Sequence, residues 1–147
     1  MIQDRVVSAS ALVEAPAHTV FDLLASPGRH AAFDGSGSVR RLVRGPDRLF
    51  LGARFAMGMH LGVPYAMVNK VVEFEEGRRI AWTHIGRAIW RYELEPAGTT
   101  STRVTESFDM RSSPLAAVFE ATGFAERNER GIVRSLALLA DVVRTAR

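Results

Sequence analysis

The fold is decided by residues 71–110, which read VVEFEEGRRIAWTHIGRAIWRYELEPAGTTSTRVTESFDM. The stretch contains four extended segments, separated by turns that contain glycine or proline at residues 76–77, 86 and 96–98. Aromatic and ionisable residues alternate along the segments, as they do in β-strands that have one buried face. The stretch therefore predicts antiparallel strands joined by hairpins, one face of which lines an interior.

The remaining chain adds strands and helices to this stretch. Alternating patterns predict seven strands in all, at residues 5–14, 38–44, 53–61, 64–75, 79–85, 88–95 and 102–110. After the first strand, Val20, Phe21 and Leu24 fall on one face at helical spacing, so residues 16–24 are expected to form a short helix. A second helical turn is expected at residues 28–33, ahead of a flexible glycine-rich segment.

A long amphipathic helix is expected to close the chain. A serine-serine-proline entry at residues 112–114 is followed by apolar residues every three or four positions as far as Val143. An unbroken helix over residues 114–145 would be roughly 48 Å long at about 1.5 Å per residue, which exceeds the width of a small domain. We therefore expect a kink or a break at Gly123 or in the polar run at residues 126–130.

Together these elements predict one α+β domain over residues 1–147. The seven strands are expected to form a curved antiparallel sheet that wraps round the long C-terminal helix, with two short helices after the first strand. A sheet with one lined face, folded round one helix, makes a container. The fold therefore predicts that the protein holds an apolar molecule.

The composition excludes several kinds of site. Hydrophobic residues make up 47% of the chain and charged residues 24%, which is typical of a globular domain and excludes a fibrous or disordered chain. The lack of cysteine excludes disulfides, thiolate catalysis and cysteine-based zinc sites. The four histidines have no metal-site spacing, with His18 expected at the surface and His30 in a polar loop. No glycine-rich segment carries the lysine of a phosphate-binding loop, so we expect no metal and no cofactor.

Charge and hydropathy set further expectations about partners. The net charge of +3 comes from eighteen arginines, one lysine and sixteen acids, and because the acids are interspersed with the arginines we expect no nucleic-acid binding. No apolar run is long enough for stable membrane insertion. The first sixteen residues, MIQDRVVSASALVEAP, have no export-signal pattern, which favours a cytoplasmic location. The strand at residues 5–14 has a free edge that can pair with a second copy, so a homodimer is left open.

Strand parity predicts which side chains line the container. Alternate residues share a face, so the interior is expected to receive Trp82 with His84, Trp90 with Tyr92, and Glu106 with Phe108. In the strand after Pro64 two rows compete, and we favour the row that contains Tyr65 on the upper half, because a bulge can switch parity partway along. The expected ligand-binding residues are Phe55, Met57, Met59, Tyr65, Met67, Asn69, Trp82, Trp90, Phe108, Phe119 and Phe124. Mostly apolar walls with a few polar groups are typical of small-molecule sites.

Three of the expected interior residues carry chemistry. A carboxyl group that faces an apolar cavity has a raised pKa, which suits a general acid or base, so Glu106 is the main catalytic candidate. His84 beside it would complete an acid/base pair that can enolise a ketone or dehydrate an alcohol, and Tyr92 is the third candidate. The alternative interpretation is structural: Glu106 forms a buried ion pair or hydrogen bond with His84 or Tyr92, or lies in water at the cavity rim.

Short segments along most of the chain resemble one superfamily. They are VEAPA at 13–17 leading into VFDLL at 20–24, VVEF at 71–74, RIAW at 79–82 and TRVTESFD at 102–109. In this order they resemble the START-like, or helix-grip, superfamily (SRPBCC), and within it the bacterial polyketide cyclase/dehydrase and lipid-transport branch. The resemblance implies the helix-grip fold and a lipid, polyketide or aromatic metabolite as ligand. It leaves open a cyclase or dehydratase activity and, as in some relatives, a protein-interaction role.

Overall fold

The structure, a computed structural model, describes residues 1–145 and is built on one sheet of eight antiparallel strands. The strands are β1 (Ile2–Gln3), β2 (Val6–Val13), β3 (Val39–Arg44), β4 (Arg54–Leu61), β5 (Val63–Glu75), β6 (Arg79–Thr83), β7 (Ile89–Pro96) and β8 (Thr102–Asp109). Their order is β1-β2-β8-β7-β6-β5-β4-β3, so β3 to β8 form a meander and β2 pairs with β8. The antiparallel α+β fold is confirmed, but the expected number of seven strands is wrong. The extra strand, β1, has two residues and is too short to leave a sequence pattern.

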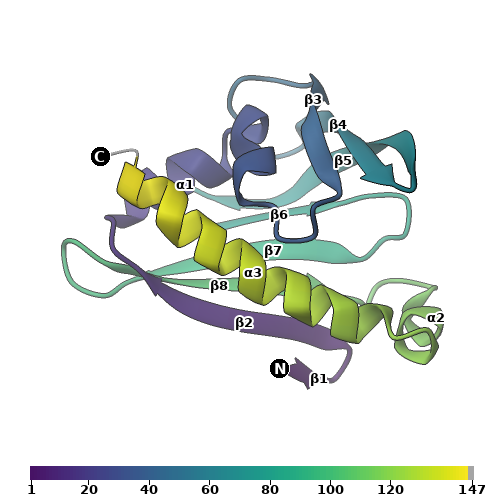
Figure 1. The fold of residues 1–147 in the computed structure, drawn as a ribbon. Helices are drawn as coiled ribbons and strands as arrows, with labels where there is room; N and C mark the ends of the chain where they lie inside the picture. Colours follow the sequence, from purple (N-terminus) through teal and green to yellow (C-terminus); the bar gives the residue numbers. More distant parts are fainter. Residues whose placement is uncertain (146–147) are drawn as a thin grey trace.

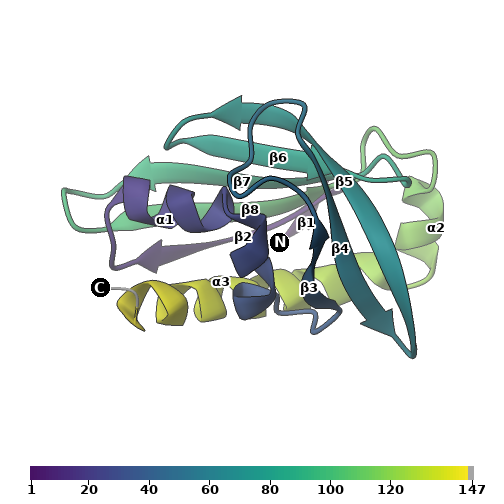
Figure 2. The ribbon, with the colours of Figure 1, turned by 90° about the horizontal axis from the view of Figure 1, so that it is seen from above.

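Four helices complete the fold: α1 (Ala17–Leu24), the 3-10 helix η1 (Pro27–Phe33), α2 (Ala116–Ala121) and α3 (Phe124–Thr145). The expected break in the C-terminal helix is confirmed at Gly123, whose φ of +76° lies in the left-handed region that favours glycine. Figure 1 shows α3 lying across one face of the sheet. Figure 2 shows β4 and β5 bending away from the plane of β7 and β8 at the end of the molecule where α2 lies.

The core lies between α3 and the part of the sheet that contains β2 and β8. The buried stripe of α3, which includes Ile132, Leu136 and Leu139, packs against these strands. Full burial of one such side chain stabilises the fold by about 1.5–3 kcal/mol. This packing fixes one edge of α3 on the sheet and leaves the other edge free to cover a cavity.

A change of parity, which the sequence left open, is present in β5. The register with β6 shifts between Val71, which pairs with Trp82, and Glu73, which pairs with Ala81. Because of this bulge, the row from Tyr65 to Val71 and the later Phe74 both contribute to the inner side. The bulge also bends the strand and so helps the sheet to curl.

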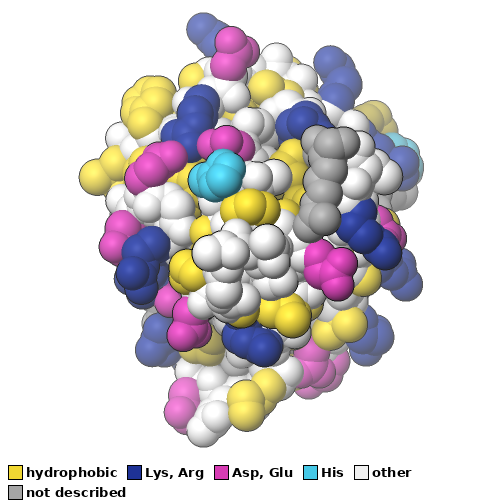
Figure 3. Space-filling model, turned by 90° about the vertical axis from the view of Figure 1, so that its left-hand side faces the viewer, with side chains coloured by type: hydrophobic (Ala, Val, Ile, Leu, Met, Phe, Trp, Pro, Cys, Tyr) yellow, Lys and Arg dark blue, Asp and Glu magenta, His cyan; other side chains and the backbone are white. Residues whose placement is uncertain are grey.

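The end of the molecule opposite α2 has a mixed surface. Basic, acidic and apolar side chains are interspersed there (Figure 3). Part of the arginine excess is used in ion pairs, as at Arg48, which contacts Asp22 at 3.0 Å and Glu76 at 2.5 Å. Within residues 1–145, no helix is both long and apolar enough to cross a membrane.

Candidate functional site

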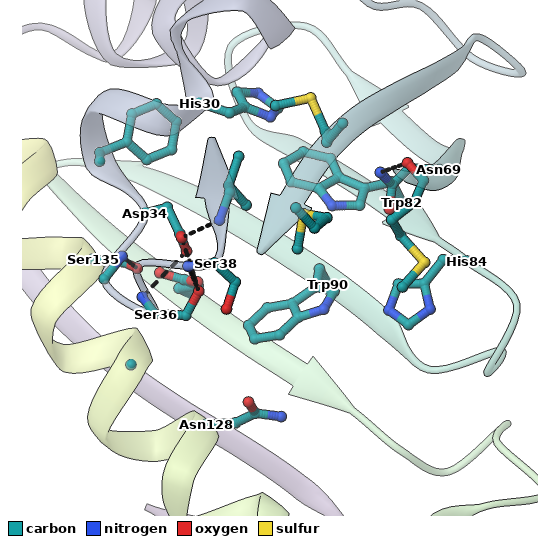
Figure 4. A pocket seen from close by; sticks show the side chains of 18 of the residues that line it. His30, Asp34, Ser36, Ser38, Asn69, Trp82, His84, Trp90, Asn128 and Ser135 are labelled. Atoms are coloured by element: carbon teal, nitrogen blue, oxygen red, sulfur yellow. Dashed lines mark hydrogen bonds between the residues drawn. The ribbon is translucent and has the colours of Figure 1, made fainter. Parts of the chain in front are cut away.

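A cavity of about 500 Å³ lies between the inner face of the sheet and the N-terminal half of α3 (Figure 4). This volume is within the range of small-molecule sites. All three catalytic candidates line it, namely His84, Tyr92 and Glu106. Nine of the eleven expected ligand-binding residues also line it: Phe55, Met57, Met59, Tyr65, Met67, Asn69, Trp82, Trp90 and Phe124.

One wall of the cavity is aromatic. Trp82 of β6 and Trp90 of β7 are direct partners in the sheet register, so their rings stand side by side on the inner face. Phe55 meets the ring of Trp82 edge-on with centroids 5.6 Å apart, and Tyr92 lies 5.8 Å from it. The two tryptophans are the only ones in the chain. Tryptophan fluorescence therefore reports on this cavity alone.

His30 lines the cavity, although its sequence context did not indicate a site residue. It was expected in a polar loop, but η1 places it in the core, 6% exposed, where it stacks on Trp82 with centroids 4.9 Å apart. Its Nε2 donates a hydrogen bond to the carbonyl oxygen of Leu24 at 2.7 Å. Burial lowers the pKa of His30 to about 4, so the ring is neutral at pH 7. The available signal was the i, i+3 spacing of His30 and Phe33 in a short helical turn.

Glu106 and Tyr92 form the polar centre of the inner wall. They are direct partners across β7 and β8, and both are buried. Burial is the main cause that raises the pKa of Glu106 to about 8, and the nearby charge of Asp34 adds to the rise, whereas a hydrogen bond with Tyr92 opposes it. At pH 7 the carboxyl group is therefore mostly protonated. Its Oε1 atom is buried without a hydrogen-bond partner.

His84 lies apart from Glu106, so the expected acid/base pair is not formed. The strand register aligns Glu106 with Tyr92 and then with Ile80, four residues before His84. At about 3.3 Å per residue this offset is roughly 13 Å along the strand. Burial lowers the pKa of His84, and its Nδ1 atom has no hydrogen-bond partner among the described residues. Strand parity predicted the face correctly but could not supply the register.

The segment after η1, which was expected to be flexible, is held in place by hydrogen bonds. The carboxylate of Asp34 accepts hydrogen bonds from the hydroxyl of Ser36 at 2.8 Å and from the backbone N–H of Val39 at 2.9 Å. The N–H of Gly35 donates to Ser135 Oγ of α3 at 2.7 Å. A Cβ atom at Gly35 would lie 2.4 Å from backbone atoms of α3, so only glycine fits there. This segment therefore forms a fixed border of the cavity.

Phe108 and Phe119, the two other expected ligand-binding residues, do not line the cavity. Phe108 is fully buried beside Trp90, its direct partner across β7 and β8, with ring centroids 4.7 Å apart. Phe119 of α2 packs against Phe108 and against Phe124, at 5.8 and 4.9 Å. The aromatic cluster therefore packs against Trp90 and Phe124, which line the cavity.

The N-terminal half of α3 contributes a wall of which the sequence pattern indicated only Phe124. Besides Phe124, the lining residues from this helix are Arg127, Asn128, Arg130, Gly131, Arg134 and Ser135. Gly131 has no side chain to occupy the space, and a Cβ atom there would meet only Ser36 N, at 4.0 Å. The signal that could have indicated this wall is the pair of small residues, Gly131 and Ser135, beside the apolar stripe of the helix.

The polar atoms of the cavity are unusual in one respect. Three buried side-chain N or O atoms of the described residues have no hydrogen-bond partner: His84 Nδ1, Glu106 Oε1 and Asn128 Nδ2. All three residues line this cavity. Buried polar groups of folded proteins are nearly always hydrogen-bonded, because each unpaired group is costly.

Within the described part of the chain, no group of three or more His, Cys, Asp or Glu residues is placed to hold a metal ion.

Comparisons with known proteins agree with this architecture. The model of a family described as polyketide cyclase/dehydrase and lipid transport matches residues 4–144. The "Uncharacterized protein Rv0088" of Mycobacterium tuberculosis is 39% identical over 140 residues, which are 92% of this chain and 62% of that protein. The chain thus spans less than two thirds of the length of this relative.

Solved structures share the fold at low sequence identity. Protein NE0264 from Nitrosomonas europaea superposes with a TM-score of 0.74 at 15% identity, and the match covers 99% of this chain and 98% of that chain. The Zhui aromatase/cyclase from Streptomyces sp. R1128 superposes with a TM-score of 0.71 at 16% identity, with coverages of 97% and 96%. These likenesses confirm the helix-grip fold and carry no statement about activity.

Proposed function

The chain belongs to the polyketide cyclase/dehydrase and lipid transport family, and from this premise we propose that it binds an apolar small molecule in the cavity under α3. The observation that carries the proposal is the cavity of about 500 Å³, which is walled by aromatic and methionine side chains. Protein interiors are normally close-packed, so an open space of this size is costly to maintain. Lipids, polyketides and aromatic metabolites fit its chemistry, because a few polar groups interrupt an apolar wall.

The proposal is tested by titrating the protein with N-phenyl-1-naphthylamine, a neutral apolar probe, while tryptophan emission is recorded. Because Trp82 and Trp90 both line the cavity, a bound probe should change their emission in a saturable manner. The variant Gly131→Leu places a side chain in the cavity and should weaken binding at least tenfold. Gly131→Ala, which adds one methyl group in open space, is the matched control and should keep most of the affinity.

Two outcomes would reject the proposal. One is a lack of saturable binding by the wild-type protein across a panel of neutral lipids and aromatic compounds. The other is equal probe affinity for Gly131→Leu and Gly131→Ala, provided that circular dichroism shows both variants to be folded.

A second candidate function, an acid/base enzyme such as a cyclase or dehydratase, is favoured by one observation. The buried carboxyl of Glu106 has its pKa raised to about 8 and keeps an unpaired oxygen in the cavity. A carboxyl group with a pKa near neutrality can take a proton from carbon or give one to oxygen at physiological pH. Tyr92, its direct partner across β7 and β8, would help to hold it in position. The roles of Glu106, Tyr92 and His84 in catalysis stay a prediction.

The enzyme candidate is tested with 1-tetralone, a bicyclic ketone that exchanges protons next to its carbonyl group. If Glu106 acts as a base in the cavity, the wild-type protein should accelerate exchange of these protons for deuterium in D₂O. Glu106→Gln should abolish the acceleration while keeping the fold. Exchange at the same rate in both proteins would remove Glu106 from the mechanism without affecting the binding proposal.

The other expectations about partners stay predictions. A protein-interaction module needs a filled core and an exposed apolar surface, so the cavity favours the binding function over it. β1 and Met1 cover the edge of β2 only as far as Ser8, which leaves the later part of β2 as an edge for a homodimer. Sedimentation equilibrium would decide between monomer and dimer. A cytoplasmic location and the lack of nucleic-acid binding are likewise kept as predictions.

A further inference from the structure

A row of three arginines lies where α3 borders the cavity. Arg127, Arg130 and Arg134 all line the cavity and are all exposed. At about 100° per residue their positions fall within about 60° of one another, and at about 1.5 Å per residue the row is about 10 Å long. Because the three arginines line the cavity and are also exposed to solvent, we assign their guanidinium groups to its mouth.

No acidic side chain of the described residues neutralises this row of arginines. None of the three arginines takes part in an ion pair within residues 1–145. Glu129, on the other side of the helix, pairs instead with the amino group of Met1. Like charges three and four residues apart destabilise a helix, and a cation in the first turn opposes the helix dipole. The row is therefore unfavourable for the helix unless a further negative charge binds to it.

Asn128 gives an independent indication at the same place. Its Nδ2 is a hydrogen-bond donor that is buried without a partner, and Figure 4 shows the side chain projecting from α3 apart from the hydrogen-bonded cluster of Asp34 and Ser36. The lining contains two acids. Asp34 already accepts hydrogen bonds from Ser36 and Val39, and Glu106 lies on the inner wall and is mostly protonated at pH 7. The mouth thus offers positive charge and a free donor, with no carboxylate paired to either.

We propose that Arg127, Arg130 and Arg134, together with the amide of Asn128, bind an anionic group at one end of the ligand. The ligand class is then an amphiphile, with an apolar body among Trp82, Trp90 and the methionines and a carboxylate or phosphate at the mouth. Arginine suits either group because its planar guanidinium forms paired, charge-assisted hydrogen bonds. The inference rests on the proposed function, since it assigns an orientation to a ligand held in the same cavity.

The experiment compares three ligands that share one twelve-carbon chain: dodecanoate, dodecyl phosphate and dodecanol. The affinity of each ligand is measured by its displacement of bound N-phenyl-1-naphthylamine, at ligand concentrations below the critical micelle concentration of that ligand. The triple variant Arg127→Gln, Arg130→Gln, Arg134→Gln should lower the affinity ratio of anion to alcohol at least tenfold, and Asn128→Leu should lower it less. A matched triple variant, Arg44→Gln, Arg54→Gln, Arg103→Gln, removes the same charge from exposed sites outside the cavity and should leave the ratio within twofold of the wild-type value.

The outcomes separate this inference from the function on which it rests. If the probe binds but both triple variants change the ratio equally, the row has no specific role and the inference fails while apolar binding stands. If neither triple variant changes the affinity ratio of anion to alcohol, the inference also fails while apolar binding stands. If the probe fails to bind at all, the proposed function fails and the inference with it. If the arginine substitutions on α3 lower the affinity for dodecyl phosphate more than that for dodecanoate, the result supports the inference and assigns the anion as phosphate. The reverse order supports the inference and assigns a carboxylate.

Discussion

The two faces of the sheet differ in how completely their polar groups are paired. On the outer face, Arg91 donates hydrogen bonds to both carboxylate oxygens of Glu73, at 2.9 and 2.6 Å, and to Asp109 at 3.2 Å. Ala81 lies between Arg91 and Glu73 in the register, so the ion pair reaches over a small side chain. Asp109 also binds Arg111. On the inner face, by contrast, His84 and Glu106 keep buried atoms without partners.

Two carboxyl groups on one strand show the difference most directly. Asp109 and Glu106 are three residues apart on β8 and so face opposite sides. Hydrogen bonds from Arg111, followed by one from Arg91, lower the pKa of Asp109 to about 2. Burial raises the pKa of Glu106 to about 8. In the folded protein the carboxylate of Asp109 is thus fully paired, whereas Oε1 of Glu106 has no hydrogen-bond partner. An unpaired polar atom is expected on the inner face if a ligand supplies its partner.

The largest expected effect comes from breaking the outer network. Asp109→Asn removes the charge that Arg91 and Arg111 share, and because the carboxylate is nearly buried we expect unfolding free energy to fall by about 2–3 kcal/mol at pH 7. Urea denaturation followed by circular dichroism measures this change. Glu95→Gln, at an exposed acid on the same sheet, is the control and should change nothing measurable. Equal stability of wild type and Asp109→Asn would show that the outer network does not stabilise the fold.

The inner carboxyl should give the opposite pH dependence. The pKa of Glu106 rises from an ordinary 4.5 to about 8 on folding, so folding takes up a proton and stability falls as pH rises through this window. The slope is about 1.4 kcal/mol per pH unit, which gives a loss of about 2 kcal/mol between pH 6.5 and 8. His30 and His84, whose pKa values are lowered by burial, contribute a slope of opposite sign that fades only above the ordinary histidine pKa of 6.5, so the difference between wild type and a Glu106 variant isolates Glu106.

Glu106→Gln is the variant that checks this dependence. Glutamine keeps the size of the side chain and has no proton to take up, so the fall in stability between pH 6.5 and 8 should disappear. The measurement is urea denaturation at pH 6.5, 7.25 and 8 for both proteins. A variant that keeps the wild-type slope would assign the proton uptake to another group and weaken the contrast between the two faces.

Removing an unpaired donor from the inner face should stabilise the protein. Asn128→Leu is close to isosteric and deletes the buried Nδ2 that has no partner, so we expect the free energy of unfolding of the ligand-free protein to rise by about 1 kcal/mol. The same variant should bind dodecanoate more weakly. A gain in stability with a loss of affinity is the pattern expected of a group kept for a ligand. A fall in stability would mean that the amide serves the fold.

The contrast between the faces also separates what the sequence could predict from what it could not. Alternation along strands is a local property, so the inward rows with Tyr65, Trp82 and Tyr92 were predictable, as was the break at Gly123. Register is not local. It depends on the length and shape of each turn, which is why His84 and Glu106 were expected side by side although four positions separate them along the sheet.

The missed part of the site has a similar cause. The apolar stripe of α3 indicated which side of the helix meets the core, but the part of the helix that covers the cavity lies beside that stripe. Which flank does so depends on how the helix is rotated and placed on the sheet. The arginine row and Asn128 therefore looked like ordinary polar surface in the sequence, and His30 looked like part of a loop until η1 folded back onto Trp82.

The smallest expected effect tests whether the inner face is truly unfilled. Alanine has a higher helix propensity than glycine, and a Cβ atom at Gly131 meets nothing closer than 4.0 Å, so Gly131→Ala should raise the unfolding free energy by about 0.5–1 kcal/mol. Gly35→Ala is the contrasting control, because its Cβ atom would lie 2.4 Å from the backbone of α3 and should destabilise the protein. Urea denaturation of both variants measures the difference. A loss of stability in Gly131→Ala would mean that the space beside α3 is already filled, whereas a gain means that glycine there costs stability and keeps room for a ligand.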